Sequence, residues 1–164
     1  MSDARLRTIT RDDIDALHAI NQANTPEVGS VTVERLAWLV DQSAIALTAT
    51  IDQEIAGFCL VIAPGSNYES VNYRWFAEHH PEAMYLDRVA VDERYWRRGV
   101  GNALYDEVEA QVAQRPGSHE LALEINVEPP NPRSLAFHDQ RGFAEVGRQD
   151  TNYGVTVSLQ IKQC

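Results

Sequence analysis

Near the middle of the chain, an apolar segment, a loop rich in Arg and Gly, an amphipathic helix and a second apolar segment follow one another. The apolar segments, residues 84–91 and 121–127, have the length and composition of strands. Between them, residues 100–114 place Leu104 and Val108 one helical turn apart. A helix between two strands indicates a strand–helix–strand crossover, which restricts the chain to folds that mix α and β structure.

Further strand and helix patterns flank this crossover. Two hairpins are expected, one over residues 44–50 and 54–62 and one over residues 143–149 and 155–161. Helices are predicted from Thr10 to about Asn24, from Thr32 onward, and after Asn131, which can cap a short helix with Pro132 at its first position. With no repeat and no linker, the order predicts the fold class α/β (α+β mixed) and one domain over residues 1–164.

The chain is acidic. Its 164 residues include 24 Asp and Glu against 14 Lys and Arg, which gives a net charge of -10 and a pI near 4.8. Such a surface repels phosphate backbones, so we expect no nucleic-acid partner. No apolar run approaches the roughly 18 to 20 residues that cross a bilayer, and the start lacks the apolar region of a secretory signal. We therefore expect no membrane partner and a cytoplasmic protein, which fits the presence of only Cys59 and Cys164.

The loop before the central helix concentrates positive charge. Arg88, Arg94, Arg97 and Arg98 fall close together there, and Gly99 and Gly101 follow at the helix start. Unpaired N–H groups, a positive dipole end and small residues together can bind a pyrophosphate. The Arg side chains could instead balance nearby carboxylates, and the glycines could serve only a tight turn. A Rossmann loop would need a small residue where Leu104 stands, and a Walker A loop would need Gly-Lys-Ser/Thr, so both rank lower.

This order, with the later run Asn131-x-x-Ser134-x-x-Phe137-His138-x-x-x-Gly142-Phe143, resembles the GNAT superfamily of acyl-CoA N-acyltransferases. The motifs cover about residues 84–149, and the element order extends the likeness to the whole chain. The resemblance implies a single GNAT-like domain with a mostly antiparallel central sheet flanked by helices, a splayed cofactor cleft and acetyl-CoA as cofactor. The implied CoA-binding residues are Val89, Ala90 and Val91 on the strand, Arg97, Arg98, Gly99, Val100, Gly101 and Asn102 in the loop, and Asn131, Ser134, Phe137, His138 and Arg141 around the later helix.

The chain departs from the family pattern at two positions. The family loop usually begins with Gln or Arg where this chain has Trp96, so one phosphate contact is either lost or taken over by Arg97 or Arg98. The frequent Tyr of the later helix, which often donates a proton to the departing thiolate, is replaced by His138. An imidazolium can donate a proton to a thiolate, so His138 is the predicted acid, with simple packing beside pantetheine as the alternative.

Two carboxylates are candidates for the base. The alternation in residues 121–127 places Glu124 and Asn126 on one face of the strand, where Glu124 could remove a proton from an amine. The competing interpretation of Glu124 is a salt bridge or a substrate anchor. Asp87 lies among apolar neighbours on the preceding strand and is the second candidate, with a buried pair to an Arg as its alternative.

A long connection between residues 62 and 84 carries Tyr68, Tyr73, Trp75 and Phe76. Long connections are often functional, so we interpret these aromatic side chains, with Asn126, as a wall or lid for the acceptor substrate. They could instead hold a long loop against the body of the protein. His79 and His80 lack the spacing of a zinc motif and are expected in a surface loop, so no metal is predicted.

The sequence predicts an enzyme that transfers an acetyl or other acyl group from acetyl-CoA to an amine in a ternary complex. The acidic surface favours a positively charged acceptor, either a small molecule or an exposed amine of a protein. One alternative is a regulatory module that binds CoA without turnover, and another is an unrelated nucleotide-binding domain. Neither the acceptor nor the oligomeric state, including a homodimer, follows from the sequence.

Overall fold

The computed structural model describes residues 3–164, and its strands form a sheet in the order β1-β2-β3-β4-β5-β7-β6. Strands β4 and β5 run parallel, whereas the pairs β1–β2, β2–β3, β5–β7 and β6–β7 run antiparallel. The α/β class and the mostly antiparallel sheet are thus confirmed. The strands are β1 (Arg5–Thr8), β2 (Ile45–Ile51), β3 (Glu54–Ile62), β4 (Met84–Val91), β5 (Glu120–Glu128), β6 (Ala144–Asp150) and β7 (Thr156–Gln163).

Within the described residues there are five α-helices and two short 3-10 turns, at Arg11–Asp13 and Glu93–Tyr95. No helix of this part of the chain has both the length and the apolar character needed to span a membrane. The helices are α1 (Ile14–Ala23), α2 (Val33–Gln42), α3 (Val71–His79), α4 (Val100–Ala113) and α5 (Pro132–Gln140).

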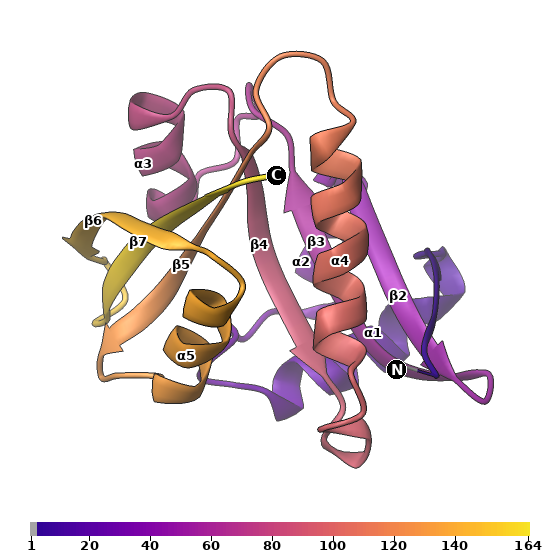
Figure 1. Cartoon of the computed structure of the whole chain (residues 1–164). Helices are drawn as coiled ribbons and strands as arrows, with labels where there is room; N and C mark the ends of the chain where they lie inside the picture. Colours follow the sequence, from indigo (N-terminus) through magenta and orange to yellow (C-terminus); the bar gives the residue numbers. More distant parts are fainter. Residues whose placement is uncertain (1–2) are drawn as a thin grey trace. The chain divides into compact units, whose positions relative to one another are not determined.

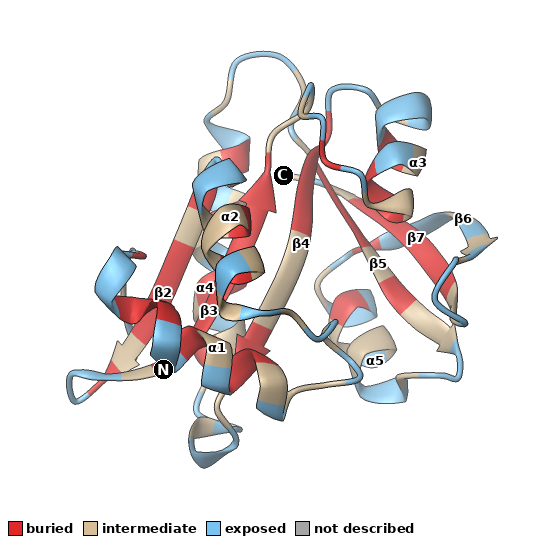
Figure 2. Ribbon diagram, turned by 180° about the vertical axis from the view of Figure 1, so that it is seen from behind, coloured by how far each residue is buried: buried red, intermediate tan, exposed pale blue. Residues whose placement is uncertain are grey.

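The chain divides into two compact units. The first comprises the part of the chain up to Ile62 together with Leu86–Gln111. In it, α4 covers one face of strands β2–β4 while α1 and α2 cover the other (Figures 1 and 2). Leu17 of α1, Leu36 of α2 and Leu104 of α4 are fully buried, so each helix contributes an apolar stripe to the packing of the sheet.

The second unit comprises Ala63–Tyr85 and Val112–Cys164 and contains α3, α5 and strands β5, β7 and β6. Register places Glu124 opposite Leu159 and Leu159 opposite Gly147, so these three positions form one row on one face. The ring of Trp75 lies over Gly147, which puts α3 on that face.

Helix α5 and the turn after it lie on the opposite face of the same strands. The Lys162 ammonium lies 5.9 Å from the centre of the Phe143 ring, and Lys162 alternates with Ile161, which shares the face of Ala122. The Glu124 side of the sheet therefore carries α3, and the other side carries α5.

Two elements differ from the sequence expectations. Residues 71–79, expected as part of an irregular connection, form α3, which begins where the Ser70 hydroxyl accepts a hydrogen bond from the Tyr73 amide at 3.3 Å. Strand β1 was not expected, because its four residues Arg-Leu-Arg-Thr give too short an alternation to indicate a strand. Both elements are held by contacts with distant parts of their own unit.

The contact that fastens β1 is an ion pair between Arg7 and Asp13. The Arg7 guanidinium donates to both carboxylate oxygens of Asp13, at 2.7 and 2.9 Å, and the Thr10 amide donates to one of them at 2.7 Å. The hydrogen bond from Arg7 is the main cause that lowers the pKa of Asp13 to about 2. Because this pKa lies below its unfolded value, the pair stabilises the fold above about pH 4 and stops doing so as the pH falls toward 2.

We expect Asp13→Asn to lower the free energy of unfolding by about 1 to 2 kcal/mol at pH 7, with the difference from wild type shrinking between pH 4 and pH 2. Urea denaturation across this pH range measures the difference. The exposed neighbour provides a control, since Asp12→Asn should change stability little at either pH. A deficit in Asp13→Asn that is the same at pH 3 and pH 7 would contradict the ion-pair explanation.

Candidate active site

The loop before α4 turns through residues in the left-handed backbone conformation. Arg97 and Gly99 adopt positive φ angles of 64° and 78°, and the Ala103 amide donates to the Gly99 carbonyl at 2.9 Å, which closes the first turn of α4. Because α4 begins at Val100, the amides of its first turn point out of the helix end, at the positive end of the helix dipole. This helix start can therefore bind an anion.

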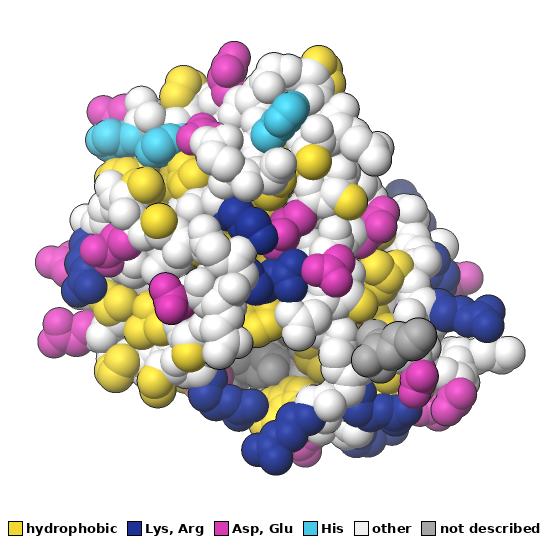
Figure 3. Space-filling view, viewed as in Figure 1, with side chains coloured by type: hydrophobic (Ala, Val, Ile, Leu, Met, Phe, Trp, Pro, Cys, Tyr) yellow, Lys and Arg dark blue, Asp and Glu magenta, His cyan; other side chains and the backbone are white. Residues whose placement is uncertain are grey.

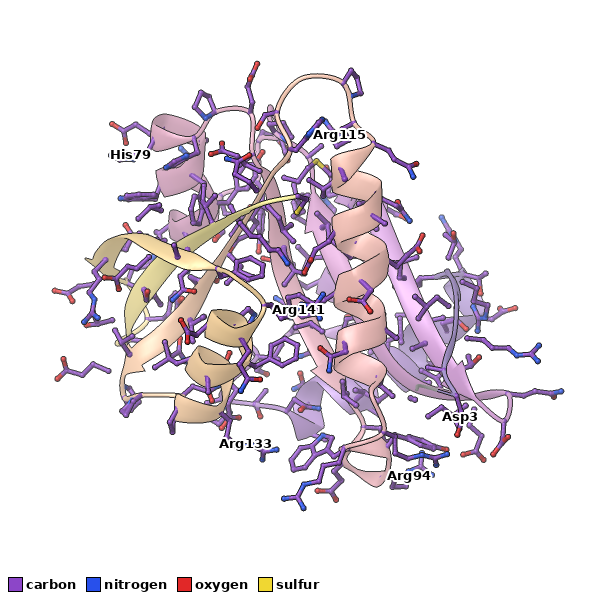
Figure 4. The ribbon with its side chains drawn as sticks, in the orientation of Figure 1. Asp3, His79, Arg94, Arg115, Arg133 and Arg141 are labelled. Carbon is purple, nitrogen blue, oxygen red and sulfur yellow. The ribbon has the colours of Figure 1, made fainter. Side chains whose placement is uncertain are left out.

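A hollow of about 550 Å³ opens beside this helix start. Arg side chains gather below the start of α4 on the face shown in Figure 3, and Asp3 and Arg94 lie near the same end of α4 in Figure 4. The hollow combines two cations with two carboxylates. Its lining residues are Asp3, Arg97, Arg98, Gly99, Asn102, Ala103 and Asp106.

The four clustered Arg residues divide into two kinds. Arg94 bonds Asp92 at 2.8 Å, and this hydrogen bond lowers the pKa of Asp92. Arg98 lies in the hollow and reaches Asp3 at 3.4 Å, where both side chains are solvent-exposed and the pair is weak. Charge balance explains Arg94, whereas Arg97 and Arg98 line the predicted anion site.

Asp87 and Arg88 form a buried pair on β4. The Arg88 Nε atom donates to Asp87 at 3.0 Å, and one terminal nitrogen of Arg88 donates to Asn21 of α1 and to the Gly29 carbonyl. A buried pair with an Arg is the alternative to a catalytic role for Asp87 that the sequence allowed. Arg88 consequently joins the strand to α1 and lies outside the anion site.

The end of β4 approaches β3 and α4 closely. A Cβ atom on Gly57 of β3 would lie 2.9 Å from the Ala90 carbonyl oxygen and 3.1 Å from a methyl group of Val100. The missing side chain at Gly57 therefore lets the first residue of α4 pack directly over β3. Val100 is buried, so it can reach a ligand only through its backbone.

Trp96 occupies the position at which the family loop has Gln or Arg. Its indole nitrogen donates to the Val91 carbonyl at 3.0 Å, and the side-chain Nδ2 atom of Asn24 donates to the same carbonyl at 3.1 Å. The ring is 46% exposed. Because this carbonyl already accepts two hydrogen bonds within the chain, a ligand along β4 would use the other backbone groups of Val89, Ala90 and Val91.

In the second unit, Glu124 lies beside the hydroxyl of Tyr85. Glu124 is half-buried on β5, and the Tyr85 hydroxyl donates to its Oε2 atom at 2.7 Å. Asn126, two residues further on the same face, is also half-buried. Glu124 thus accepts a hydrogen bond from a neutral donor. Sequence reasoning missed Tyr85, although its pairing with Ala122 in a parallel register would have placed it near Glu124.

Helix α5 forms as predicted, with the Asn131 side chain capping it by accepting a hydrogen bond from the Ser134 amide at 3.3 Å. The His138 Nδ1 atom bonds the Ser134 carbonyl at 2.7 Å, and the His138 ring packs edge-on against Phe137 and Phe143. The guanidinium carbon of Arg141 lies 5.8 Å from the centre of the Phe137 ring. His138 is buried between the rings of Phe137 and Phe143, as expected if the residue serves only to pack the helix.

The aromatic segment does not form an exposed lid. Tyr68, Tyr73 and Phe76 are buried, and Tyr73 and Phe76 pack against Tyr85 with ring centres 5.5 and 6.0 Å apart. A buried ring cannot contact a substrate without leaving its neighbours, so these three fit the alternative in which they hold the segment in place. Trp75 is half-buried over Gly147, so of the four aromatic side chains it is the one with surface that a substrate could contact.

The two adjacent histidines contact parts of the second unit. His79 lies in α3, where its ring stacks on Trp75 at 4.1 Å, and His80 approaches Glu120 at 3.3 Å. The expectation of a surface loop at His79 was wrong, since this residue ends the helix. Across residues 3–164, no group of three or more His, Cys, Asp or Glu side chains is arranged to hold a metal ion.

Residues 14–143 match the model of the acetyltransferase (GNAT) family. The chain belongs to this family. The match spans most of the chain, including β4, the loop, α4, β5 and α5, and it confirms the resemblance that the motifs indicated.

Solved structures share the GNAT fold over nearly the whole chain. Ard1 from Thermoplasma volcanium is 18% identical with a TM-score of 0.78, and the match covers 98% of this chain and 97% of that one. A ribosomal-protein-alanine N-acetyltransferase from Brucella melitensis is 24% identical with a TM-score of 0.73, covering 98% and 99%. NAA60 from Arabidopsis thaliana, solved in complex with acetyl-CoA, is 17% identical with a TM-score of 0.73, also covering 98% and 99%.

We expect Gly57→Ala to destabilise this GNAT chain by about 1 to 3 kcal/mol, because the added methyl group would meet backbone and a packed methyl group. Gly29→Ala is the matched control, since a Cβ atom there meets nothing within 4 Å. Urea denaturation of both variants measures the difference. Equal stability of the two variants would show that Gly57 does not set the packing of α4.

Proposed function

We propose that the chain transfers an acetyl group from acetyl-CoA to a positively charged amine, with the whole chain acting as one acetyltransferase domain. Membership of the family gives acyl transfer as the reaction class. The observation that carries the proposal is the Arg- and Gly-lined hollow at the start of α4. A module that binds CoA without turnover would need the same hollow but would have no use for a held carboxylate such as Glu124.

The hollow fits the pyrophosphate of CoA in charge and in backbone access. Arg97 and Arg98 supply positive charge, and the amides of the first turn of α4 supply hydrogen-bond donors. A Cβ atom on Gly101 would meet nothing within 4 Å, so a phosphate can approach the backbone there. Asp3 and Asp106 oppose this charge at the edge of the hollow. We propose that the other CoA contacts come from Val89–Val91 and from the side chains of α5.

Acetyl-CoA supplies the activated acyl group, and the chain manages the protons. The acceptor arrives as an ammonium ion, and we propose that Glu124 takes the proton that this group must lose before its nitrogen can attack. The neutral amine then attacks the thioester carbonyl, a C–N bond forms, the C–S bond breaks, the sulfur leaves as a thiolate, and the nitrogen releases its second proton to water. The Tyr85 hydroxyl donates to this carboxylate at 2.7 Å.

We assign proton donation to the thiolate to His138, so that the proposed acid lies on the α5 side of the sheet and the proposed base on the side that carries Glu124. Its Nδ1 atom is held by the Ser134 carbonyl at 2.7 Å, so in the imidazolium form the Nε2 atom carries the transferable proton. The ring cannot turn freely, because Phe137 and Phe143 pack against it. The same bond that orients the ring thus selects the nitrogen that donates.

The charge of the chain supports a cationic acceptor. A net charge of -10 attracts amines, which carry positive charge at neutral pH, to the protein surface. Small amines and exposed amines of proteins both fit this chemistry. One of the structural neighbours is named for acetylating an alanine of a ribosomal protein, which makes a peptide amine a reasonable first acceptor to test.

We expect Gly101→Glu to weaken CoA binding by at least about tenfold, because a carboxylate would face the pyrophosphate. The variant should fold, since there is open space at Gly101 and Glu suits the first turn of a helix. Gly101→Ala is the control and should bind CoA much as the wild type does. Calorimetry measures both affinities, and equal CoA affinity in the two variants would place the pyrophosphate elsewhere.

We expect Glu124→Gln to lower kcat by on the order of 10²-fold near neutral pH, because it keeps the shape and removes the base. The deficit should narrow toward pH 10, where more of the acceptor amine is already unprotonated. Thiol release with acetyl-CoA and a panel of amines measures the rate. Near-normal turnover across this pH range would move the base to Asp87 or to water.

A further inference from the structure

The hydroxyl of Tyr85 reaches Glu124 from a fully packed position. Tyr85 is 1% exposed, whereas Glu124 is half-buried, so the hydrogen bond of 2.7 Å joins an interior ring to a carboxylate nearer the surface. The register explains how the two meet. Tyr85 pairs with Ala122 in the parallel β4–β5 pair, and Glu124 lies two residues further along β5 on the face that Ala122 shares.

The Tyr85 ring is held by helix α3. The ring centre of Tyr73 lies 5.5 Å from that of Tyr85 at an angle of 68°, and Phe76 packs against it at 6.0 Å. Tyr73 is itself fixed, because its hydroxyl donates to the Ala63 carbonyl at 2.7 Å and accepts from the Ser66 amide at 3.0 Å. The hydroxyl of Tyr85 consequently has a defined place, set by an interior cluster.

From this geometry we infer that Tyr85 is a positioning residue that fixes the direction of the Glu124 carboxylate toward the acceptor amine. The inference rests on the proposed function, in which Glu124 is the base. A carboxylate whose oxygen is bonded to a rigid donor loses its rotation about the last side-chain bond. The base is then aimed before the acceptor arrives, which is the arrangement that favours proton transfer.

The hydrogen bond from Tyr85 also affects the basicity of the Glu124 carboxylate. A donor to the charged form of a carboxylate lowers its pKa, so removing the Tyr85 hydroxyl should raise the pKa of Glu124. The flanking positions on this face of the strands are uncharged, namely Ala122 and Asn126 on β5 and Leu159 on β7. Along β4 and β5 the other charged groups are Glu120, which approaches His80 at 3.3 Å, and Glu128 on β5, and Asp87 with Arg88 further along β4.

The test follows the Glu124 carboxyl carbon by NMR in protein labelled with ¹³C-glutamate, with Glu124→Gln used to assign the signal. In Tyr85→Phe we expect the titration of Glu124 to move up by about one pH unit. Tyr73→Phe is the matched control, because it removes a hydroxyl of the same cluster that bonds Ala63 and Ser66, and it should leave the titration unchanged. Thermal unfolding of both variants checks that the cluster remains packed.

Kinetics provide the second readout. Tyr85→Phe should lower kcat by roughly tenfold and leave the KM for the amine nearly unchanged, because the loss of orientation of the Glu124 carboxylate outweighs its small gain in basicity. If Tyr85→Phe fails to fold, the phenol carbon of Tyr85 is followed instead, and its signal should shift with the titration of Glu124 in wild type and stay constant in Glu124→Gln.

An unchanged titration in Tyr85→Phe, or a phenol signal that ignores Glu124, would overturn the inference. A shifted titration with normal kcat would overturn it as well, since the contact would then have no role in transfer. Failure of the wild type to acetylate any amine class would refute the proposed function separately. The NMR titration would then still decide whether Tyr85 holds Glu124.

Discussion

The close approach at Gly57 underlies the arrangement of the first unit. With no side chain at this position of β3, the Ala90 carbonyl and the Val100 methyl group come within reach of the β3 backbone. Helix α4 therefore starts in close contact with β3 and β4, and this contact fixes the position of its first backbone amides. The loop that connects β4 to α4 must cross this short gap, which it does through positive φ angles at Arg97 and Gly99. The proposed anion site thus depends on close backbone packing as well as on charge.

A second close approach orders the other unit. Trp75 occupies the space that a side chain at Gly147 would fill, and this seats α3 on the row that contains Glu124. Once α3 is in place, Tyr73 and Phe76 enclose the Tyr85 ring. The aromatic side chains were expected to form a substrate wall, but Tyr73 and Phe76 instead pack against Tyr85. In the proposed mechanism they support Glu124 indirectly, by holding the Tyr85 ring.

The charges illustrate why a cluster in sequence need not be a cluster in function. Arg88 and Arg94 are engaged by Asp87 and Asp92, while Arg97 and Arg98 line the hollow. Alternation on a strand and the turn of a loop send neighbouring side chains in different directions, and burial then decides which of them must be paired. The two Arg residues that remain in the hollow are the ones that directly precede Gly99.

The amino-acid sequence alone predicts the elements with strong periodicity, the crossover through residues 84–127, the Arg- and Gly-rich loop before α4 and the family. These features depend on residues that are near neighbours, so spacing is enough to find them. It also placed Glu124 on a polar face and Asn131 at the cap of α5. The three-dimensional structure was needed to show that β1 pairs with β2, that residues 71–79 form a helix, that Asp87 pairs with Arg88 and that Tyr85 bonds Glu124. Side-chain packing within a unit produces the Arg7–Asp13 pair, the contact of Trp75 with Gly147 and the hydrogen bond between Tyr85 and Glu124. Local patterns of polarity in the sequence do not encode such contacts.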